Sequence, residues 1–221
     1  MHRPDFSEFV VHFTKDPPTI VEVSPGEMVH DVRGLSAMEW LFSILELGQI
    51  WATKMPWTNK PAVCFTECTW SSLLFHEEHY SRYGIGFHKS FLFAAGGGPA
   101  IYLPPGMMKH QEKHVGPDKL PFDSHLYAFV TPFIPPYVSD DYKEKYWLGK
   151  PPIDYSHERE WRVSHDLVFE PNKIAFVIVN TYEDMAKAPK PLKDAIGRDN
   201  WLIMANYEKI EEFLPLHRLP E

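Results

Sequence analysis

The stretch His157-Glu158-Arg159-Glu160-Trp161-Arg162-Val163 combines the alternation of a β-strand with a high density of charge. Successive side chains of a strand project to opposite faces. One face would then carry two carboxylates and a guanidinium, from Glu158, Glu160 and Arg162. The opposite face would carry Arg159, Trp161 and Val163. Charges on a rigid element are costly to bury unless they pair or bind something, so the stretch predicts either a salt-bridge ladder or a binding site.

Another strand is predicted over residues 9–14, a run of β-forming residues that ends before Pro17 and Pro18. The alternation of a strand places His12 and Thr14 on one face. A single histidine near a strand end is usually structural, whereas a His-x-Thr pair also suits a face that meets a ligand. Both interpretations stay open from the residues alone.

The best-defined helix of the sequence is predicted between Ser36 and Gly48. Ser36 suits the N-cap, and Glu39 stands three residues later, as in a capping box. Apolar residues recur at helical spacing from Trp40 to Leu47. Gly48 suits a left-handed C-cap, so the helix is expected to end there.

Shorter patterns indicate a mixture of strands and helices along the rest of the chain. Strands are predicted near residues 62–66, 83–87, 99–103, 159–164, 167–169, 174–180 and 201–204. Helices are predicted near residues 69–79, 89–95, 122–133, 182–187 and 207–214. Residues 104–120 are expected to form a mobile loop, and residues 135–155 a surface excursion beside the charged strand. The expected fold is a single, irregular α+β domain over residues 1–221.

The composition limits the classes of function. The 221 residues carry a formal net charge of −8 and contain no polybasic tract. Binding to a nucleic-acid backbone without sequence preference is therefore disfavoured as the main activity. The sequence shows no signal peptide and no apolar run long enough to cross a bilayer. A cytoplasmic protein without membrane association is expected.

Histidines and cysteines do not predict a metal site. His76 and His79 lie three apart in a predicted helix, and His110 and His114 lie four apart in a predicted loop. Neither pair has an evident third ligand, so solvated positions are expected. The two cysteines, Cys64 and Cys68, have no second pair with which to complete a zinc site, and free thiols are expected.

The segment from Tyr80 to Phe87 combines aromatic rings, an arginine and two glycines. Glycines allow close approach of a ligand, tyrosine can stack on a base, and Arg82 can bind a phosphate. The spacing is not that of a GxGxxG fingerprint, so a Rossmann nucleotide site is not predicted.

Several of these motifs together resemble known bacterial families. His12-Phe13-Thr14 followed by the helix that ends in Gly48 is similar to the opening of DarT-type ADP-ribosyltransferases. Val63-Cys64-Phe65-Thr66-Glu67, Tyr83-Gly84-Ile85-Gly86-Phe87 and the late Glu-x-Glu-Trp-Arg resemble the AbiGi abortive-infection family of phage-resistance proteins. The resemblance implies a mixed, split β-sheet core flanked by helices that holds NAD.

The same resemblance implies roles for individual residues. His12 would bind the adenosine ribose of NAD, with Thr14 beside it. Tyr83, or else Tyr80, would stack on nicotinamide. The catalytic carboxylate would be Glu160, which stabilises positive charge as nicotinamide leaves. Glu158 would orient the nucleophile, and Arg82 or Arg162 would bind the pyrophosphate.

The leading hypothesis is thus an NAD-dependent ADP-ribosyltransferase of a phage-defence or toxin system, which modifies a macromolecular acceptor, either nucleic acid or protein. A second hypothesis is a non-catalytic antitoxin that keeps the fold and binds a partner protein of a toxin–antitoxin pair. A third is a metal-dependent nuclease that uses Glu158, Glu160 and one of the histidine pairs. The first hypothesis requires His12, Tyr83 and Glu160 to line one cleft.

Overall fold

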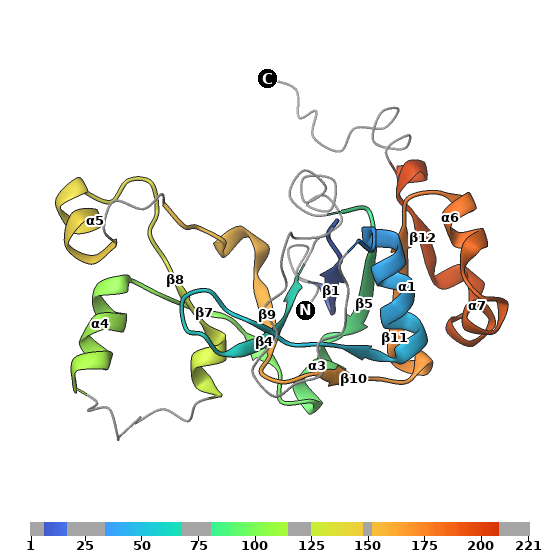
Figure 1. The fold of residues 1–221 in the computed structure, drawn as a ribbon, viewed down its shortest axis with the longest axis horizontal. Helices are drawn as coiled ribbons and strands as arrows, with labels where there is room; N and C mark the ends of the chain where they lie inside the picture. The colour runs from blue at the N-terminus through green and yellow to red at the C-terminus, as the bar shows by residue number, and fades with distance from the viewer. Residues whose placement is uncertain (1–6, 17–33, 68–80, 115–124, 148–151, 208–221) are drawn as a thin grey trace.

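The computed structural model describes residues 7–16, 34–67, 81–114, 125–147 and 152–207. Within these residues, one sheet of eight strands runs in the order β12-β11-β5-β1-β4-β9-β6, and the eighth strand, β3, pairs with β4 outside this order (Figure 1). These strands are β1 (Phe9–Phe13), β3 (Thr53–Lys54), β4 (Pro61–Thr66), β5 (Gly84–His88), β6 (Gly98–Pro99), β9 (Glu160–Val163), β11 (Ile174–Val179) and β12 (Trp201–Ile203).

The sheet is mixed, as predicted. β11 and β12 run parallel, whereas β5, β1, β4 and β9 form an antiparallel series. β1 pairs with β5 along its whole length but with β4 at one position, where Val11 stands opposite Thr66. The two strands therefore diverge beyond that pair. The α+β class with a mixed sheet is confirmed.

Helix α1 (Ala37–Leu47) covers one face of the sheet and has both predicted caps. The Ser36 hydroxyl accepts a hydrogen bond from the Glu39 backbone, and the Glu39 carboxylate accepts one from the Ser36 backbone. Gly48 ends the helix with a φ of 63°, a conformation that favours glycine. The apolar stripe buries Leu41, Ile44 and other residues against the sheet.

Short helices extend the same layer. They are α3 (Lys89–Ala94), α6 (Tyr182–Lys187) and α7 (Lys190–Ile196). Leu92 of α3 and Ile196 of α7 lie in the main core with Leu41 and Val10. Thr181 and Asp184 form a second capping box at the start of α6. The main core therefore lies between this helical layer and one face of the sheet.

The described residues from β7 to α5 form a smaller lobe, at the left in Figure 1. It contains the parallel strands β7 (Ile101–Leu103) and β8 (Val130–Pro132), the helices α4 (Pro105–His114) and α5 (Asp140–Trp147), and the 3₁₀ turn η1 (Leu126–Phe129). The remaining elements are β2 (Gln49–Ile50), β10 (Leu167–Val168) and the 3₁₀ turns η2 (Ser156–Glu158), η3 (Pro171–Lys173) and η4 (Arg198–Asn200).

Two predictions for this lobe are wrong. Residues 105–114 form helix α4 instead of a loop, because Pro105 fits the first turn and the Gly106 backbone donates to the Tyr142 hydroxyl of α5. The apolar helix predicted over 122–133 is, in its described part, a 3₁₀ turn followed by β8. Pairing of β8 with β7 outweighs the helical pattern there. The helix predicted over 69–79 lies outside the described residues, as does the helix predicted over 207–214 apart from its first residue.

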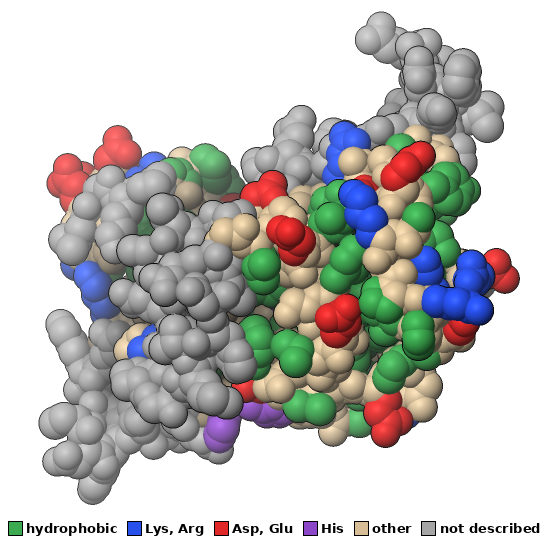
Figure 2. Space-filling model, turned by 45° about the vertical axis from the view of Figure 1, so that its right-hand side comes forward, with side chains coloured by type: hydrophobic (Ala, Val, Ile, Leu, Met, Phe, Trp, Pro, Cys, Tyr) green, Lys and Arg blue, Asp and Glu red, His purple; other side chains and the backbone are tan. Residues whose placement is uncertain are grey.

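Charged and apolar side chains are interspersed on the face shown in Figure 2, and neither sign of charge covers it. Among the helices that are described, none is both long and apolar enough to cross a membrane.

Candidate functional site

The charged stretch is only partly a strand. β9 begins at Glu160, and Glu158 belongs to the preceding 3₁₀ turn η2. Arg159 between them has a φ of 45°, a left-handed conformation that breaks the strand alternation. The prediction that Glu158 shares a strand face with Glu160 is therefore wrong. Nevertheless, the turn brings both carboxylates to one cavity.

Glu160 and Arg162 form a buried bidentate ion pair. The Arg162 Nε donates to Glu160 Oε1 at 2.8 Å, and Nη2 donates to Oε2 at 2.7 Å. The Arg162 side chain is fully buried, with 0% exposed. Burial alone lowers the pKa of Arg162, but hydrogen bonding to Glu160 together with nearby negative charge outweighs burial and raises the pKa. The guanidinium therefore stays charged, and its two hydrogen bonds to Glu160 are charge-assisted.

All five donors of Arg162 are used within the protein. Besides Glu160, Nη1 donates to the backbone oxygens of Ala128 at 2.8 Å and Val130 at 3.1 Å, and Nη2 donates to the Thr131 hydroxyl. Arginine has five N–H groups and no acceptor. Arg162 therefore fastens β9 to the smaller lobe, and it has no donor left for the pyrophosphate that the resemblance implied.

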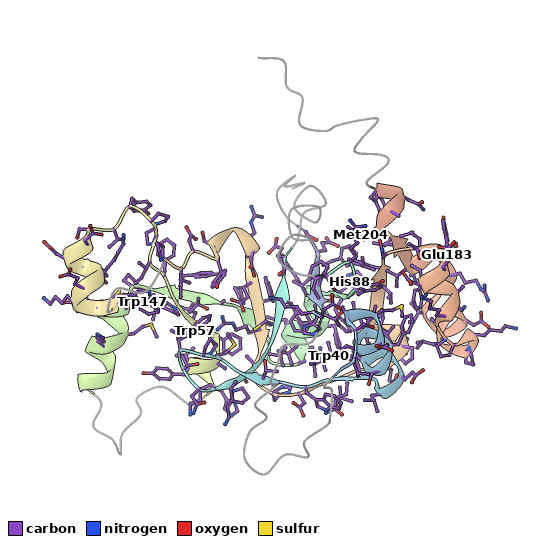
Figure 3. All side chains as sticks on the ribbon, turned by 45° about the horizontal axis from the view of Figure 1, so that its top comes forward. Trp40, Trp57, His88, Trp147, Glu183 and Met204 are labelled. Atoms are coloured by element: carbon purple, nitrogen blue, oxygen red, sulfur yellow. The ribbon has the colours of Figure 1, made fainter. Side chains whose placement is uncertain are left out.

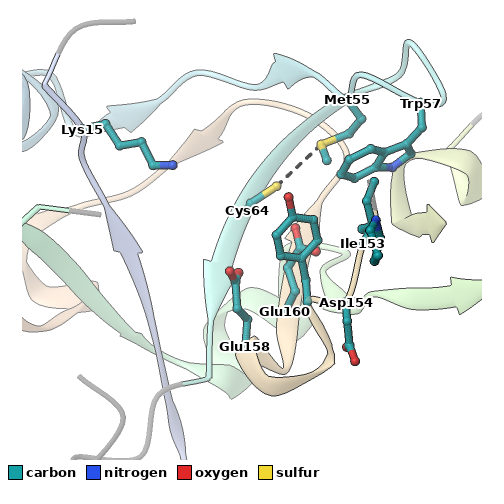
Figure 4. Close-up of a pocket in the computed structure, with 10 residues that line it drawn as sticks. Lys15, Met55, Trp57, Cys64, Ile153, Asp154, Glu158 and Glu160 are labelled. Atoms are coloured by element: carbon teal, nitrogen blue, oxygen red, sulfur yellow. Dashed lines mark hydrogen bonds between the residues drawn. The ribbon is translucent and has the colours of Figure 1, made fainter. Parts of the chain in front are cut away.

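A cavity of about 610 Å³ lies beside this ion pair (Figure 4). It lies between the end of β4, the η2 turn and the chain that follows β1. The residues that line it are Lys15, Met55, Trp57, Cys64, Pro152, Ile153, Asp154, Tyr155, Glu158 and Glu160. One wall is apolar and aromatic, and the floor carries carboxylates. Glu158 and Glu160 are each 8% exposed, so they are largely desolvated but are not sealed from this space.

The aromatic wall is held in place from behind. The Trp57 Nε1 donates to the Val130 backbone oxygen at 2.7 Å, and the Arg162 guanidinium carbon lies 5.8 Å from the centre of the Trp57 ring. The Tyr155 ring lies 6.5 Å from that of Trp57 and is tilted by 32°. Tyr155 is 39% exposed, so its ring also forms part of the mouth.

The cavity has a negative electrostatic environment. Burial first, and then the charge of Glu160, raise the pKa of the Cys64 thiol well above its usual range. Burial and the charge of the same carboxylate also raise the pKa of Tyr102. In both cases Glu158 acts in the same direction and Arg162 opposes it. Cys64 is thus a neutral thiol, 3.7 Å from the Met55 sulfur, and not a nucleophile.

His12 lies on the other side of the sheet from this cavity. Val11, Thr66 and Glu160 stand in register across β1, β4 and β9, so their side chains share one face. His12 follows Val11 and projects to the opposite face, where its ring meets Phe65 edge-on. The register thus separates His12 from Glu160.

The His12 ring forms a hydrogen bond with the backbone of β4. Its Nδ1 lies 2.9 Å from the Cys64 carbonyl oxygen, which can only accept, so Nδ1 carries the proton. Burial lowers the pKa of His12, and this hydrogen bond opposes the shift only in part. His12 is therefore a neutral ring that connects β1 to β4 where the two strands begin to diverge.

Thr14 and Tyr83 also have structural partners on the side of α1 and α6. The Thr14 hydroxyl donates to the Ala37 backbone oxygen at 2.7 Å and fastens the start of α1. The Tyr83 hydroxyl donates to Asp184 at 3.0 Å. Burial and that carboxylate raise the pKa of Tyr83 to about 12. Neither residue lines the cavity of Glu160.

The remaining predicted residues are dispersed. Arg82 donates to the Asn180 side chain at 3.1 Å, beyond the end of β11. Tyr80 lies outside the described residues, as does the His76–His79 pair. Across the described ranges, no group of three His, Cys, Asp or Glu side chains is arranged to hold a metal ion. The structure therefore brings together Glu158 and Glu160 and places His12, Thr14, Arg82 and Tyr83 elsewhere.

The sequence interpretation missed the aromatic wall. Trp57 follows Pro56 in a turn, and Tyr155 ends the predicted surface excursion. Neither position belongs to a periodic pattern. Because residues 135–155 were expected to border the charged strand, their tyrosines and tryptophans were the available signal.

Comparison with known proteins assigns the chain to a family. Residues 51–188 match the model of the family described as "Putative abortive phage resistance protein AbiGi, antitoxin", which is more than half of the chain. The chain belongs to the AbiGi family. No curated protein and no solved structure matches it. The AbiGi part of the resemblance is confirmed, whereas no comparison relates the chain to DarT-type transferases.

The AbiGi match includes the cavity but leaves out the first strand. It contains every cavity residue except Lys15, together with Arg162 and the η1–β8 segment that Arg162 binds. β1, with His12 and Thr14, lies outside the matched residues. The part of the chain that defines AbiGi membership is therefore the part that builds the cavity.

Proposed function

We propose that this AbiGi protein is the antitoxin of a phage-defence abortive-infection system and that it acts by binding a toxin partner protein. The observation that carries the proposal is the match of residues 51–188 to the AbiGi antitoxin family, because these residues build the acidic, aromatic cavity. Such a concave site on a rigid sheet suits recognition of a partner.

The state of the charged residues supports binding over catalysis. Glu160 is held by two hydrogen bonds from Arg162, and the four groups that the guanidinium binds fix its position. A catalytic carboxylate needs substrate-binding groups around it, but His12 and Tyr83 face the other side of the sheet. A preformed surface with satisfied internal hydrogen bonds suits a binding protein.

A growth assay tests this function. Each neighbouring gene of the locus is expressed in a bacterial host with and without this chain. A neighbour that arrests growth alone and is tolerated when the chain is present would identify the toxin and support the proposal. Growth arrest caused by this chain itself, relieved by Glu160→Gln, would contradict it.

A second candidate is an NAD-dependent ADP-ribosyltransferase with NAD as its substrate. The observation that favours it is the convergence of Glu158 and Glu160 on one cavity with the aromatic rings of Trp57 and Tyr155. In that reaction a carboxylate stabilises the cationic sugar as nicotinamide leaves, and the acceptor takes the ADP-ribose. The chemistry would need Glu160 to accept from the ribose hydroxyl with a lone pair that its two hydrogen bonds from Arg162 leave open.

Nicotinamide release separates the two candidates. Purified protein is incubated with NAD and with DNA, RNA or protein acceptors, beside a Glu160→Gln variant. Release by the wild-type protein and not by the variant would establish the transferase. An absence of both NAD binding and nicotinamide release would eliminate it and leave the antitoxin.

A further inference from the structure

We propose that the cavity receives an arginine side chain of the toxin partner, with the guanidinium on the carboxylates and its flat face against the aromatic wall. The inference rests on the proposed antitoxin function and names the chemistry of the contact. The growth assay above identifies a toxin but says nothing of how it is held.

The size of the cavity suits one side chain. Its volume of about 610 Å³ lies within the range of pockets that hold small ligands, and the mouth is open at Tyr155. A side chain that is inserted into such a pocket and fully desolvated is the usual form of a binding hot spot, and arginine is one of the residue types that most often form one.

The walls are suited to a planar cation. Guanidinium groups stack on aromatic faces and bind carboxylates in a bidentate manner. Trp57 and Tyr155 supply the rings, while Glu158 and Glu160 supply the carboxylates (Figure 4). The exposed Asp154 adds a third negative charge at the rim, where its carboxylate accepts hydrogen bonds from the Ser156 backbone and hydroxyl. Lys15 lies opposite the carboxylates, at the other side of the cavity, and Arg162 lies behind Glu160. The carboxylates outnumber these two cations.

One guanidinium of the protein itself, that of Arg162, already contacts a cavity carboxylate and a cavity ring. Arg162 pairs with both oxygens of Glu160 and lies 5.8 Å from the centre of the Trp57 ring. Each carboxylate oxygen has two acceptor positions, so one bond from Arg162 leaves each oxygen of Glu160 able to accept another. Glu160 and Trp57 also line the cavity, which offers a second guanidinium the same two partners from the other side.

The electrostatic environment points to the same class of ligand. The negative field of Glu160 and Glu158 raises the pKa of Cys64 and Tyr102 after burial is taken into account, even with Arg162 opposing it. An anionic ligand would therefore be repelled. Metal ions are a poor alternative, because the described residues contain no group that could hold one.

The test uses Nα-acetyl-arginine amide as the probe and the neutral isostere Nα-acetyl-citrulline amide as its control. Binding to the purified full chain is followed by calorimetry and by tryptophan fluorescence. Saturable binding of the arginine derivative, with no binding of the citrulline derivative, is expected. Equal binding of both, or of neither, would overturn the proposal.

Three variants locate the contact. Glu158→Gln is expected to weaken binding of the arginine derivative about tenfold, since the amide oxygen can still accept a hydrogen bond but the negative charge that strengthens it is lost. Glu183→Gln on α6, far from Trp57 in Figure 3, is the matched control and leaves the affinity unchanged. Tyr155→Leu, at the exposed mouth, weakens binding without removing a charge. Equal effects of Glu158→Gln and Glu183→Gln would contradict the assigned site.

The growth assay distinguishes this inference from the proposed function. A wild-type chain that relieves no neighbouring gene's toxicity overturns the antitoxin role. A chain that relieves it equally well with Glu158→Gln and Tyr155→Leu keeps the antitoxin role and overturns the cavity contact. Loss of relief in these two variants, with relief retained in Glu183→Gln, supports both.

Discussion

The two faces of β4 and β9 contrast sharply, although the same strands supply them. One face carries Val63, Phe65 and Val163, all buried in the main core beneath α1. The other face carries the buried Glu160–Arg162 pair and the cavity. Alternation along a strand produces both, since neighbouring residues project to opposite sides.

The contrast separates stability from function. The apolar face needs no special geometry beyond close packing. The charged face needs every donor of Arg162 satisfied, because a buried charge without partners is strongly destabilising. Replacing a buried ion pair by two apolar side chains of similar size often leaves the stability of a protein unchanged. Retention of the Glu160–Arg162 pair therefore fits a role in binding. Four predictions test this contrast, beginning with the largest effect.

Arg162→Leu is expected to destabilise the protein by about 3–5 kcal/mol, because Glu160 is left buried without its partner. Urea unfolding followed by circular dichroism measures the change. The control is Arg198→Ala, which removes an exposed ion pair with Asp194 and is expected to cost less than about 1 kcal/mol. Similar losses of unfolding free energy for the two variants would show that the buried ion pair contributes no more to stability than an exposed one.

A double variant sharpens the same point. Adding Glu160→Leu to Arg162→Leu removes the unpaired carboxylate, so about 1–3 kcal/mol of the lost stability should return. A complete double-mutant cycle with the two single variants measures this coupling energy. If the second substitution destabilised the protein further, the stranded charge would not be the cause of the first loss.

On the opposite face, Thr14→Val keeps the shape of the side chain and removes the hydroxyl that binds the Ala37 carbonyl. The expected loss of unfolding free energy is about 0.5–1.5 kcal/mol. The arginine-derivative titration should not change, because Thr14 does not line the cavity. Weakened binding together with unchanged stability would restore a ligand role for Thr14.

His12 gives the smallest effect, which depends on pH. The folded protein lowers the His12 pKa below its ordinary value of 6.5. As the pH falls through 6.5, the unfolded chain takes up the proton first, so stability declines below that pH and is fully present above it. His12→Asn, which retains a donor for the Cys64 carbonyl, should flatten this decline. An unchanged pH profile would assign the decline to other groups.

Local chemistry predicted the helix of residues 37–47, because its caps and apolar stripe lie within one short segment. The strands at β1, β4, β5 and β11 follow for the same reason. The site was harder to predict. Alternation shows which residues of one strand share a face, but it does not show which faces of different strands meet. His12 and Glu160 were therefore assigned to one cleft, and the register of β1 with β4 separates them.

The partners of Arg162 show the same limit over a longer distance. Its donors reach Ala128, Val130 and Thr131, about thirty residues earlier in the chain. No sequence pattern in residues 125–134 predicts that their backbone carbonyls bind a guanidinium. The left-handed conformation of Arg159 is equally invisible, since φ above zero is uncommon outside glycine.

The most direct test of the central claim compares one variant from each face in the growth assay. Glu158→Gln alters the cavity, and Tyr83→Phe alters the opposite face by removing one hydrogen bond to Asp184. Circular dichroism first establishes that both variants fold. We predict that the chain with Tyr83→Phe still relieves the toxicity of its partner when the two are expressed together, and that the chain with Glu158→Gln does not. Full relief of the toxicity by the Glu158→Gln variant would contradict the account.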